Sequence, residues 1–274
     1  MIRAWMQLSR LPNVLVAAGG VWLGHACLPG PVPWGRAALG SLAMGLLAAA
    51  GNMHNDVADL AIDRVNRPDR PLPSGRIGPR AALAGAAACL ILALAAAYAL
   101  GPSEAALAAG MGLLLFVYNL RLKGMPLVGN LAVALLCALA IYLPELGKRP
   151  DYTLMPVLFA FLATLAREVA KDAEDVAGDR EQGALTLPIL WGAGAAKAAV
   201  TAACLATLLL LPLPWLRLGY HIGYPIAAAA LCLPLLASVL AALRAAEPPW
   251  GPIQKRLKLL MLAGMIAILL GVRA

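Results

Sequence analysis

The sequence predicts an all-α protein that crosses a membrane about nine times. Hydrophobic residues make up 62% of the 274 residues and charged residues only 13%, whereas soluble domains are nearer half apolar and a quarter charged. The apolar residues fall into stretches of about 20 residues, the length that a helix needs to cross the hydrocarbon core. One bundle of helices then uses nearly the whole chain, so we expect a single transmembrane domain over residues 1–274.

The predicted spans follow one another with short connections rich in Pro and Gly. Alanine-rich runs pervade them, as close packing of helices in lipid favours. The first span contains Gly19, Gly20 and Gly24, which membrane helices tolerate. The nine expected spans are 12–28, 37–58, 81–100, 104–120, 126–146, 152–171, 194–212, 223–243 and 256–272.

The basic residues predict the orientation of an integral, multi-pass membrane protein. With the N-terminus in the cytoplasm and nine alternating spans, all but five of the 22 Lys and Arg residues face the cytoplasm, as the positive-inside rule requires. The five on the other side are Arg36, Lys148, Arg149, Arg217 and Arg273. This orientation puts both acidic connecting segments, and hence the expected active site, on the cytoplasmic side.

The net charge of +8 does not indicate a nucleic-acid partner. Aromatic residues are only 5% of the chain, and the basic residues lie in short loops, so topology and phosphate binding account for the charge. The five cysteines all fall in apolar stretches without a CxxC pair, which is typical of small buried hydrophobic residues.

The first acidic segment covers residues 52–80. Its Asn55, Asp59 and Asp63 are spaced i, i+4, i+8, so on a helix they line one stripe. Asp56 lies beside that stripe. The segment continues the cytoplasmic end of an expected span, which places the stripe at the membrane boundary.

The second acidic segment covers residues 167–188. Asp172, Asp175 and Asp179 are spaced i, i+3, i+7, which again makes one stripe, and Lys171 lies close to it. For a single segment of this kind, a solvated helix end with ordinary salt bridges is an equally good explanation. Two rigidly spaced segments on one face, each beside basic residues, favour a binding site.

Clustered carboxylates near a membrane boundary repel one another and are costly to desolvate. Mg²⁺ neutralises such groups, because it takes oxygen ligands from one or two carboxylates and completes its shell with water and phosphate oxygens. Arg67, Arg70 and Lys123 suit the same phosphate anion. We therefore expect Mg²⁺ and a diphosphate between the two acidic segments.

Four stretches resemble the UbiA superfamily of intramembrane prenyltransferases. NDVADLAIDRVNRPDRPLPSGRI, from Asn55, is similar to its first aspartate-rich motif, and KDAEDVAGDREQGALTLP, from Lys171, to its second. The loop 118-YNLRLKG-124 and the 10-RLPN-13 before the first span are similar to the corresponding family segments. The resemblance covers most of the chain and implies a nine-helix fold.

The resemblance also implies residue roles and a mechanism, in which a prenyl diphosphate ionises at the two motifs and a membrane-embedded acceptor attacks its C1. The implied catalytic residues are Asn55, Asp59, Asp63, Asp175, Asp179 and Lys123. The implied metal ligands are Asp56, Asp59, Asp63, Asp172, Asp175 and Asp179. The implied diphosphate or acceptor contacts are Arg67, Arg70, Lys171, Tyr118 and Arg10.

The motif text is most similar to members of the family that form ether lipids. This implies transfer of a geranylgeranyl group from geranylgeranyl diphosphate to geranylgeranylglyceryl phosphate. An aromatic or quinone-precursor acceptor and a terpene cyclase on the same scaffold stay open as alternatives. A cation or proton transporter is a distant one, because its carboxylates would lie near the bilayer midplane rather than at one face.

Overall fold

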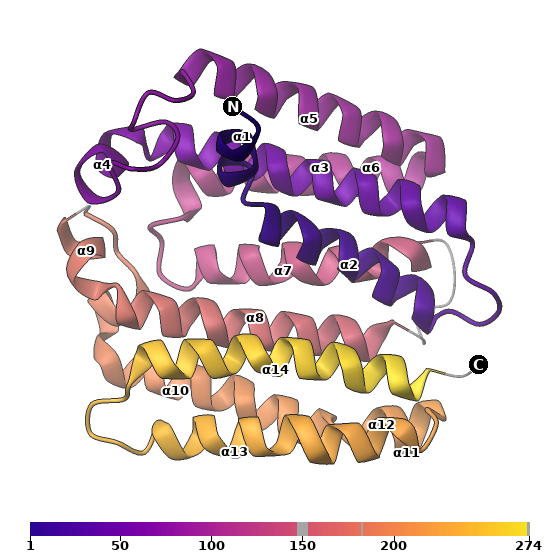
Figure 1. Cartoon of the computed structure of the whole chain (residues 1–274). Coiled ribbons are helices and arrows are strands. Elements are labelled where there is room, and N and C mark those ends of the chain that lie inside the picture. The colour runs from indigo at the N-terminus through magenta and orange to yellow at the C-terminus, as the bar shows by residue number, and fades with distance from the viewer. Residues whose placement is uncertain (147–152, 182, 273–274) are drawn as a thin grey trace. The chain divides into compact units, whose positions relative to one another are not determined.

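The computed structural model describes residues 1–146, 153–181 and 183–272, and these residues form helices and connections without a strand. The all-α prediction is confirmed. Lys148, Arg149 and Arg273 of the expected topology lie outside the described residues. The chain divides into two compact units, and Figure 1 labels helices of both. The single domain over residues 1–274 stays a prediction.

The first unit, residues 1–22 and 32–122, is built around α3, which packs along α5 and beside α6. Pro79 and Pro102 stand in the first turns of α5 and α6, where the missing proline N–H leaves no helical hydrogen bond unmade. Its helices are α1 (Ile2–Leu8), most of α2 (Leu11–Cys27), α3 (Trp34–Ala58), α4 (Leu60–Asn66), α5 (Pro79–Leu100), α6 (Pro102–Val117) and the π-helix η1 (Tyr118–Leu122).

The second unit, residues 23–31 and 123–274, is built around α8, which packs against α7, α10 and α14 (Figure 1). Its core is an apolar cluster that runs through all four helices. Its helices are α7 (Val128–Tyr142), η2 (Leu143–Glu145), α8 (Leu154–Glu174), α9 (Val176–Glu181), α10 (Leu187–Leu210), α11 (Leu213–Leu218), α12 (Gly223–Ala227), η3 (Ala228–Cys232), α13 (Leu233–Ala242) and α14 (Trp250–Gly271).

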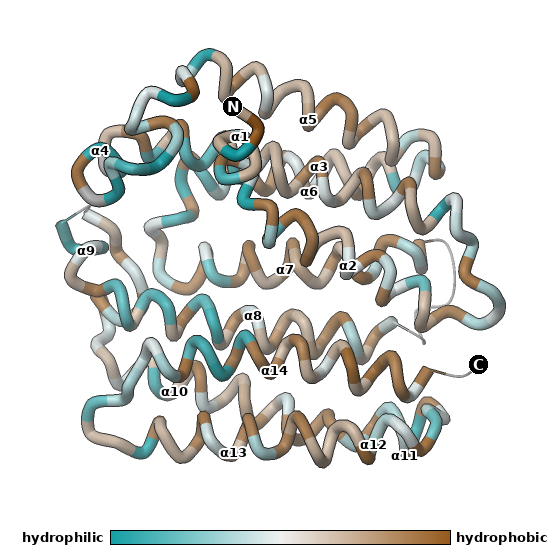
Figure 2. Tube along the Cα trace, viewed as in Figure 1, coloured by the Kyte–Doolittle hydropathy of each residue, from teal (hydrophilic) through white to brown (hydrophobic). Residues whose placement is uncertain are grey.

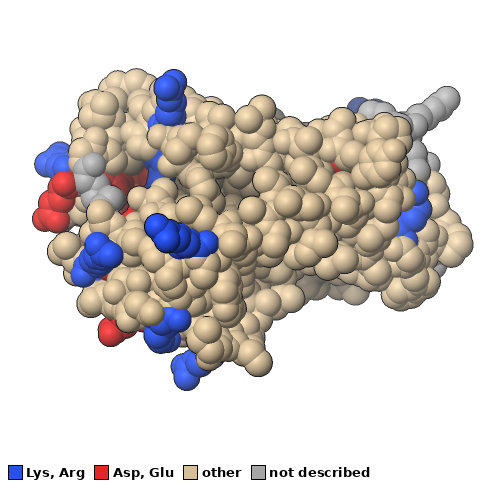
Figure 3. Space-filling view, turned by 90° about the horizontal axis from the view of Figure 1, so that it is seen from above, with Lys and Arg blue, Asp and Glu red and all other residues tan. Residues whose placement is uncertain are grey.

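Four helical runs in the described residues are long and apolar enough to cross a membrane: Pro79–Leu100, Pro102–Leu122, Leu187–Leu218 and Gly223–Ala242. α2 and α7 are shorter apolar helices. α3, α8 and α14 have 25, 21 and 22 residues, but each also carries polar residues, as the teal ends of the tube show (Figure 2). On the face seen in Figure 3, most charged side chains gather toward the two ends of the view, and uncharged residues cover most of the surface between them.

The seventh expected span, 194–212, differs from the structure because α10 begins at Leu187. Gly192 has φ 79° inside this helix and kinks it, a conformation that glycine adopts without steric cost. Residues 187–191 therefore form a separate first turn after the second acidic segment, and the apolar run that follows begins close to the predicted position.

Small residues allow close helix packing in the second unit. A Cβ on Gly24 would lie 2.1 Å from the carbonyl oxygen of Ile141, and one on Gly223 would lie 2.4 Å from that of Leu270. Backbones that approach this closely leave no room for a side chain. The small-residue pattern in the sequence thus corresponds to real helix contacts.

Candidate active site

The first acidic segment bends in the middle. α3 ends at Ala58, and Asp59 has φ −85° and ψ 2° before α4 begins, in the sparsely populated bridge region that active-site residues often occupy. The amides of Asp59 and Asp63 still donate to the carbonyl oxygens of Asn55 and Asp59, at 2.9 and 2.8 Å. Asn55 Nδ2 donates to Asp59 Oδ2 at 3.0 Å. The expected stripe is therefore present, but it is bent at Asp59.

Two arginines neutralise the buried carboxylates of this segment. Arg10 Nη2 donates to Asp56 Oδ1 at 2.5 Å, while Arg70 Nη1 lies 2.6 Å from Asp63 Oδ2 and 3.7 Å from Asp56 Oδ1. The Asp56 and Asp63 side chains are only 6% and 8% exposed, so each needs a partner of opposite charge. The structure thus brings four of the predicted residues into one network.

Arg10 reaches this network from an unusual backbone conformation. Its φ is 52°, a left-handed value that costs a non-glycine residue about 1–2 kcal/mol. Asn52 Nδ2 donates to the carbonyl oxygen of Ser9 at 2.8 Å, which fastens the α1–α2 connection to α3. This hydrogen bond and the ion pair with Asp56 hold the strained turn that carries the Arg10 guanidinium.

Arg67 and Tyr118 lie at other points of the first unit. Arg67 is exposed just after α4. Tyr118 is partly buried at the start of η1, and π-helices are frequent at functional sites. Asn119 anchors this π-helix to α3, since its Nδ2 lies 3.3 Å from the carbonyl oxygen of Gly51 and 3.0 Å from His54 Nδ1.

The second acidic segment, in the other unit, repeats the bend. α8 ends at Glu174, and Asp175 has φ −93° and ψ 9° before α9 begins. The amides of Asp175 and Asp179 donate to the carbonyl oxygens of Lys171 and Asp175, both at 2.9 Å. Both motifs therefore place an aspartate at a break between a long helix and a short one.

Asp172 is held by a residue that sequence reasoning missed. Asn130, buried near the start of α7, donates from Nδ2 to Asp172 Oδ2 at 2.7 Å. Burial raises the pKa of Asp172 to about 6, and the hydrogen bond from Asn130 opposes this rise. Charges of Asp179 and Glu168 raise the pKa further, while Lys171 lowers it. A cation that binds here relieves the electrostatic cost of ionising this carboxyl.

Asp179 lies near both predicted lysines, Lys123 and Lys171. Burial raises the pKa of Asp179, as does the neighbouring charge of Asp175, while Lys171 and Lys123 lower it. The amide of Leu185 donates to the carbonyl oxygen of Gly124 at 2.8 Å, which fixes the loop that carries Lys123. The structure therefore brings all five predicted residues of this unit into one electrostatic group, whose members are Lys123, Lys171, Asp172, Asp175 and Asp179.

Asn119 and Asn130 are the site residues that the sequence did not single out. Asn130 is a lone amide in a mainly apolar segment, whereas Asn119 lies in the loop 118–124 near Arg121 and Lys123. Polar residues in membrane helices often mark function. That signal was present in the sequence. To assign a role to either asparagine, one must know which helices pack against each other, and this information comes from the structure.

The carboxylates of each motif suit a divalent cation shared with a ligand. Among the described residues, no group of three His, Cys, Asp or Glu side chains is arranged to hold a metal ion by itself. Mg²⁺ does not require such a group, because it binds through one or two carboxylates, water and phosphate oxygens. An oxygen-only set of aspartates beside Arg and Lys fits that chemistry.

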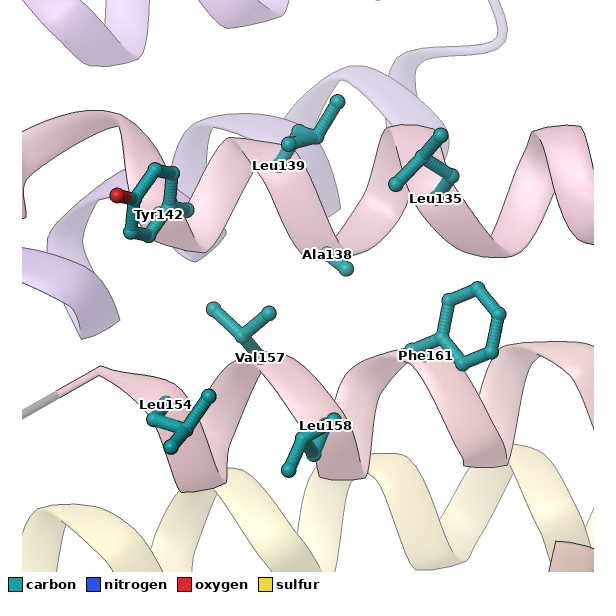
Figure 4. Close-up of a pocket in the computed structure, with 8 residues that line it drawn as sticks. All are labelled: Leu135, Ala138, Leu139, Tyr142, Leu154, Val157, Leu158 and Phe161. Carbon is teal, nitrogen blue, oxygen red and sulfur yellow. The ribbon is translucent and has the colours of Figure 1, made fainter. Parts of the chain in front are cut away.

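An apolar cavity lies between α7 and α8 in the second unit. It has a volume of about 370 Å³, and among the described residues that line it, Tyr142 alone has a side-chain polar atom (Figure 4). Its other lining residues are Leu135, Ala138, Leu139, Leu154, Val157, Leu158 and Phe161. Such a surface accepts a hydrocarbon chain and no charged group.

Comparisons with known proteins show which family the chain is similar to. The model of the UbiA prenyltransferase family matches residues 13–270. A protein of Methanopyrus kandleri named digeranylgeranylglyceryl phosphate synthase is 39% identical over 272 residues, which are 98% of each chain.

Two solved structures resemble this one. A structure described as digeranylgeranylglyceryl phosphate synthase has a TM-score of 0.83 and 27% identity, and the match covers 99% of this chain and 98% of that one. A UbiA homolog from Archaeoglobus fulgidus, bound to DMAPP and Mg²⁺, has a TM-score of 0.71 and 20% identity, with 96% and 98% covered, and shares the fold. The resemblance read from the motifs is confirmed: the chain belongs to the UbiA prenyltransferase family and is a membrane-embedded prenyltransferase.

Proposed function

We propose that this prenyltransferase transfers a geranylgeranyl group from geranylgeranyl diphosphate to geranylgeranylglyceryl phosphate, with Mg²⁺ as its cofactor. The observation that carries the proposal is the end-to-end similarity, at 39% identity, to a protein named digeranylgeranylglyceryl phosphate synthase. A fold alone leaves the acceptor open, but similarity at this level covers the motifs and the helices between them.

The proposed metal ligands are the aspartates of the two motifs. Asp59 and Asp175 stand at the helix breaks, and Asp172 and Asp179 share one electrostatic group. Bound Mg²⁺ would neutralise the diphosphate oxygens as the leaving group departs. Asp63 and Asp56 already have arginine partners, so they hold Arg10 and Arg70 in place as well.

The basic residues bind the diphosphate. Arg70 forms ion pairs with Asp63 and Asp56, which hold it in position. Its planar guanidinium suits phosphate oxygens. Lys123 and Lys171 are both exposed beside Asp179, and Arg67 is exposed after α4. These cations stabilise the charge that develops on the departing diphosphate. Tyr118 is proposed to contact the acceptor or the diphosphate.

The reaction breaks the bond between C1 of the prenyl chain and a diphosphate oxygen. The hydroxyl oxygen of the acceptor forms the new bond to C1 and loses its proton, so the products are an ether lipid, diphosphate and a proton. Apolar surface such as the α7–α8 cavity offers the hydrocarbon chain a place away from water. Exclusion of water protects the allylic cation from hydrolysis.

The active site is proposed to face the cytoplasm. In the predicted topology, all but five of the 22 Lys and Arg residues lie on the side that carries both motifs, and cytoplasmic loops of membrane proteins have this excess. A thiol-labelling experiment on single-cysteine variants in right-side-out vesicles tests the assignment. Labelling at position 69 from outside an intact vesicle would contradict it.

The substrate experiment uses purified protein in nanodiscs with Mg²⁺ and radiolabelled geranylgeranyl diphosphate. Parallel reactions contain geranylgeranylglyceryl phosphate, 4-hydroxybenzoate, a naphthoate acceptor or no acceptor. We expect a labelled ether lipid only with the glyceryl phosphate. Product with an aromatic acceptor alone would overturn the substrate assignment, and product without any acceptor would indicate a cyclase.

Matched carboxylate variants test the site. Asp59→Ala and Asp175→Ala are expected to lower kcat/KM at least about a hundredfold, on the scale of losing one strong transition-state contact. Asp69→Ala removes an exposed carboxylate from the same loop region and is expected to keep activity. Equal losses in all three variants would show that the measurement reports folding rather than the site.

A further inference from the structure

A second groove lies on the outside of the second unit, between α10 and α13. It has a volume of about 500 Å³ and is lined by Lys197, Thr201, Leu205, Leu240, Leu243 and Arg244. None of these residues belongs to the two acidic motifs or to the loop that carries Lys123. α10 and α13 run side by side here, and the groove follows the seam between them.

The groove is cationic at one end and apolar along its length. Lys197 and Arg244 stand at the charged end, and Lys197 Nζ donates to the carbonyl oxygen of Ala245 at 3.1 Å. Thr201 lies one turn further into the membrane-spanning part of α10, and Leu205 one turn beyond that, with 51% of its surface exposed. A ligand that fits this gradient has an anionic head and a hydrocarbon chain.

The two cations of the groove, Lys197 and Arg244, differ in their hydrogen-bond partners. Lys197 follows an alanine-rich turn of a membrane helix, where a charged side chain is costly unless it reaches a polar partner. Its bond to Ala245 keeps the ammonium at the groove mouth. Arg244 is exposed, and no hydrogen bond or ion pair occupies its guanidinium within residues 1–146, 153–181 and 183–272.

The charged end of the groove lies at the same end of the unit as the second acidic motif. Gln254, in the second turn of α14, donates to Glu174 at 2.9 Å, so the start of α14 lies beside the end of α8. Figure 1 shows the end of α13 and the start of α14 on the side where α8 passes into α9. This level is the expected membrane boundary, where lipid headgroups lie.

We propose that this groove binds one phosphate-bearing membrane lipid, with its phosphate on Lys197 and Arg244 and one chain along Leu205 and Leu240. Arginine and lysine are the residues that recognise phosphate oxygens, and cations near the cytoplasmic leaflet attract anionic lipids. The apolar wall selects a lipid over a soluble phosphate. The lipid would fill the seam and fasten α10 to α13.

Native mass spectrometry of the delipidated protein tests the proposal. The probes are phosphatidylglycerol, phosphatidylcholine and soluble glycerol phosphate, and thermal unfolding in detergent is the second measurement. We expect one tightly retained phosphatidylglycerol and a higher Tm with that lipid than with phosphatidylcholine. The double variant Lys197→Gln/Arg244→Gln is expected to lose about tenfold or more in lipid affinity, on the scale of losing two cations beside an anionic headgroup.

Two further variants separate this site from general effects. Lys255→Gln/Lys258→Gln removes two exposed cations from α14 and is expected to retain the lipid. Thr201→Trp fills the groove, keeps both cations and is expected to lose the lipid while it remains folded. An equal loss in the α14 variant, retention by Thr201→Trp, or displacement by glycerol phosphate would each overturn the proposal. Prenyl transfer is a separate readout, because no groove residue belongs to the motifs.

Discussion

Replacing Asn130 with alanine tests how the second acidic motif is held. Asn130 is 6% exposed, and its amide donates to Asp172 at 2.7 Å. Alanine removes the donor and leaves the carboxylate in the same partly buried position. Because the pKa of Asp172 is about 6, the acceptor of this hydrogen bond is mostly charged at pH 8 and mostly neutral at pH 5.

The expected magnitude follows from that charge. A hydrogen bond to a charged acceptor contributes about 1.5–3 kcal/mol to stability, and one between neutral groups about 0.5–1.5 kcal/mol. Asn130→Ala should therefore destabilise the protein by about 2 kcal/mol at pH 8 and by about 1 kcal/mol at pH 5. The lost donor also raises the pKa of Asp172 further, which should weaken Mg²⁺ binding at neutral pH.

Chemical unfolding in mixed micelles at the two pH values measures the effect. Asn52→Ala is the matched control, because Asn52 donates at 2.8 Å to a backbone carbonyl that does not titrate. Its cost should be equal at pH 5 and pH 8. A double-mutant cycle of Asn130→Ala with Asp172→Asn isolates the pair.

Two results would refute this reasoning. One is an Asn130→Ala cost that does not depend on pH, as in the Asn52 control. The other is a coupling energy with Asp172 below about 0.5 kcal/mol, the level at which independent sites add. Either would mean that Asn130 acts through packing rather than through the carboxylate.

Three shorter predictions concern packing, charge and metal. Gly24→Ala should lower the free energy of unfolding by about 1–3 kcal/mol in the same assay, because its Cβ would lie 2.1 Å from the Ile141 carbonyl oxygen. The control Gly35→Ala, with open space around it, should be neutral or stabilising. Arg70→Lys should raise the KM for prenyl diphosphate several-fold, because an ammonium does not reproduce the planar guanidinium, while Arg80→Lys, exposed in the first turn of α5, should not. EDTA should abolish prenyl transfer and added Mg²⁺ should restore it; full activity in EDTA would contradict the proposed cofactor.

The spans and motifs were readable from the sequence because each depends on local patterns. Apolar length predicts a membrane helix, and the spacing from Asn55 to Asp63 predicts one helical side. The bend at Asp59 was not predicted, since the helical pattern continues through it and a single pair of backbone angles changes. The kink at Gly192 was missed in the same way.

Long-range partners lie beyond what spacing predicts. The pairing of Arg10 with Asp56 joins residues 46 positions apart, and that of Asn130 with Asp172 joins residues 42 apart. Resemblance marked Arg10 and Asp172, but only the packing of α7 on α8 makes Asn130 a partner. Arg10 also adopts a left-handed backbone that no sequence pattern indicates for arginine.

The bends at Asp59 and Asp175 make the geometry of each motif adjustable in evolution. On a straight helix, the separation of two side chains eight residues apart is fixed by the rise per residue. A bend between them makes that separation depend on one residue's φ and ψ instead. Substitutions around the bend, which leave every aspartate in place, can then change the separation of the carboxylates in a motif. Proteins of this fold can thus come to bind different diphosphate esters with the same aspartate ligands.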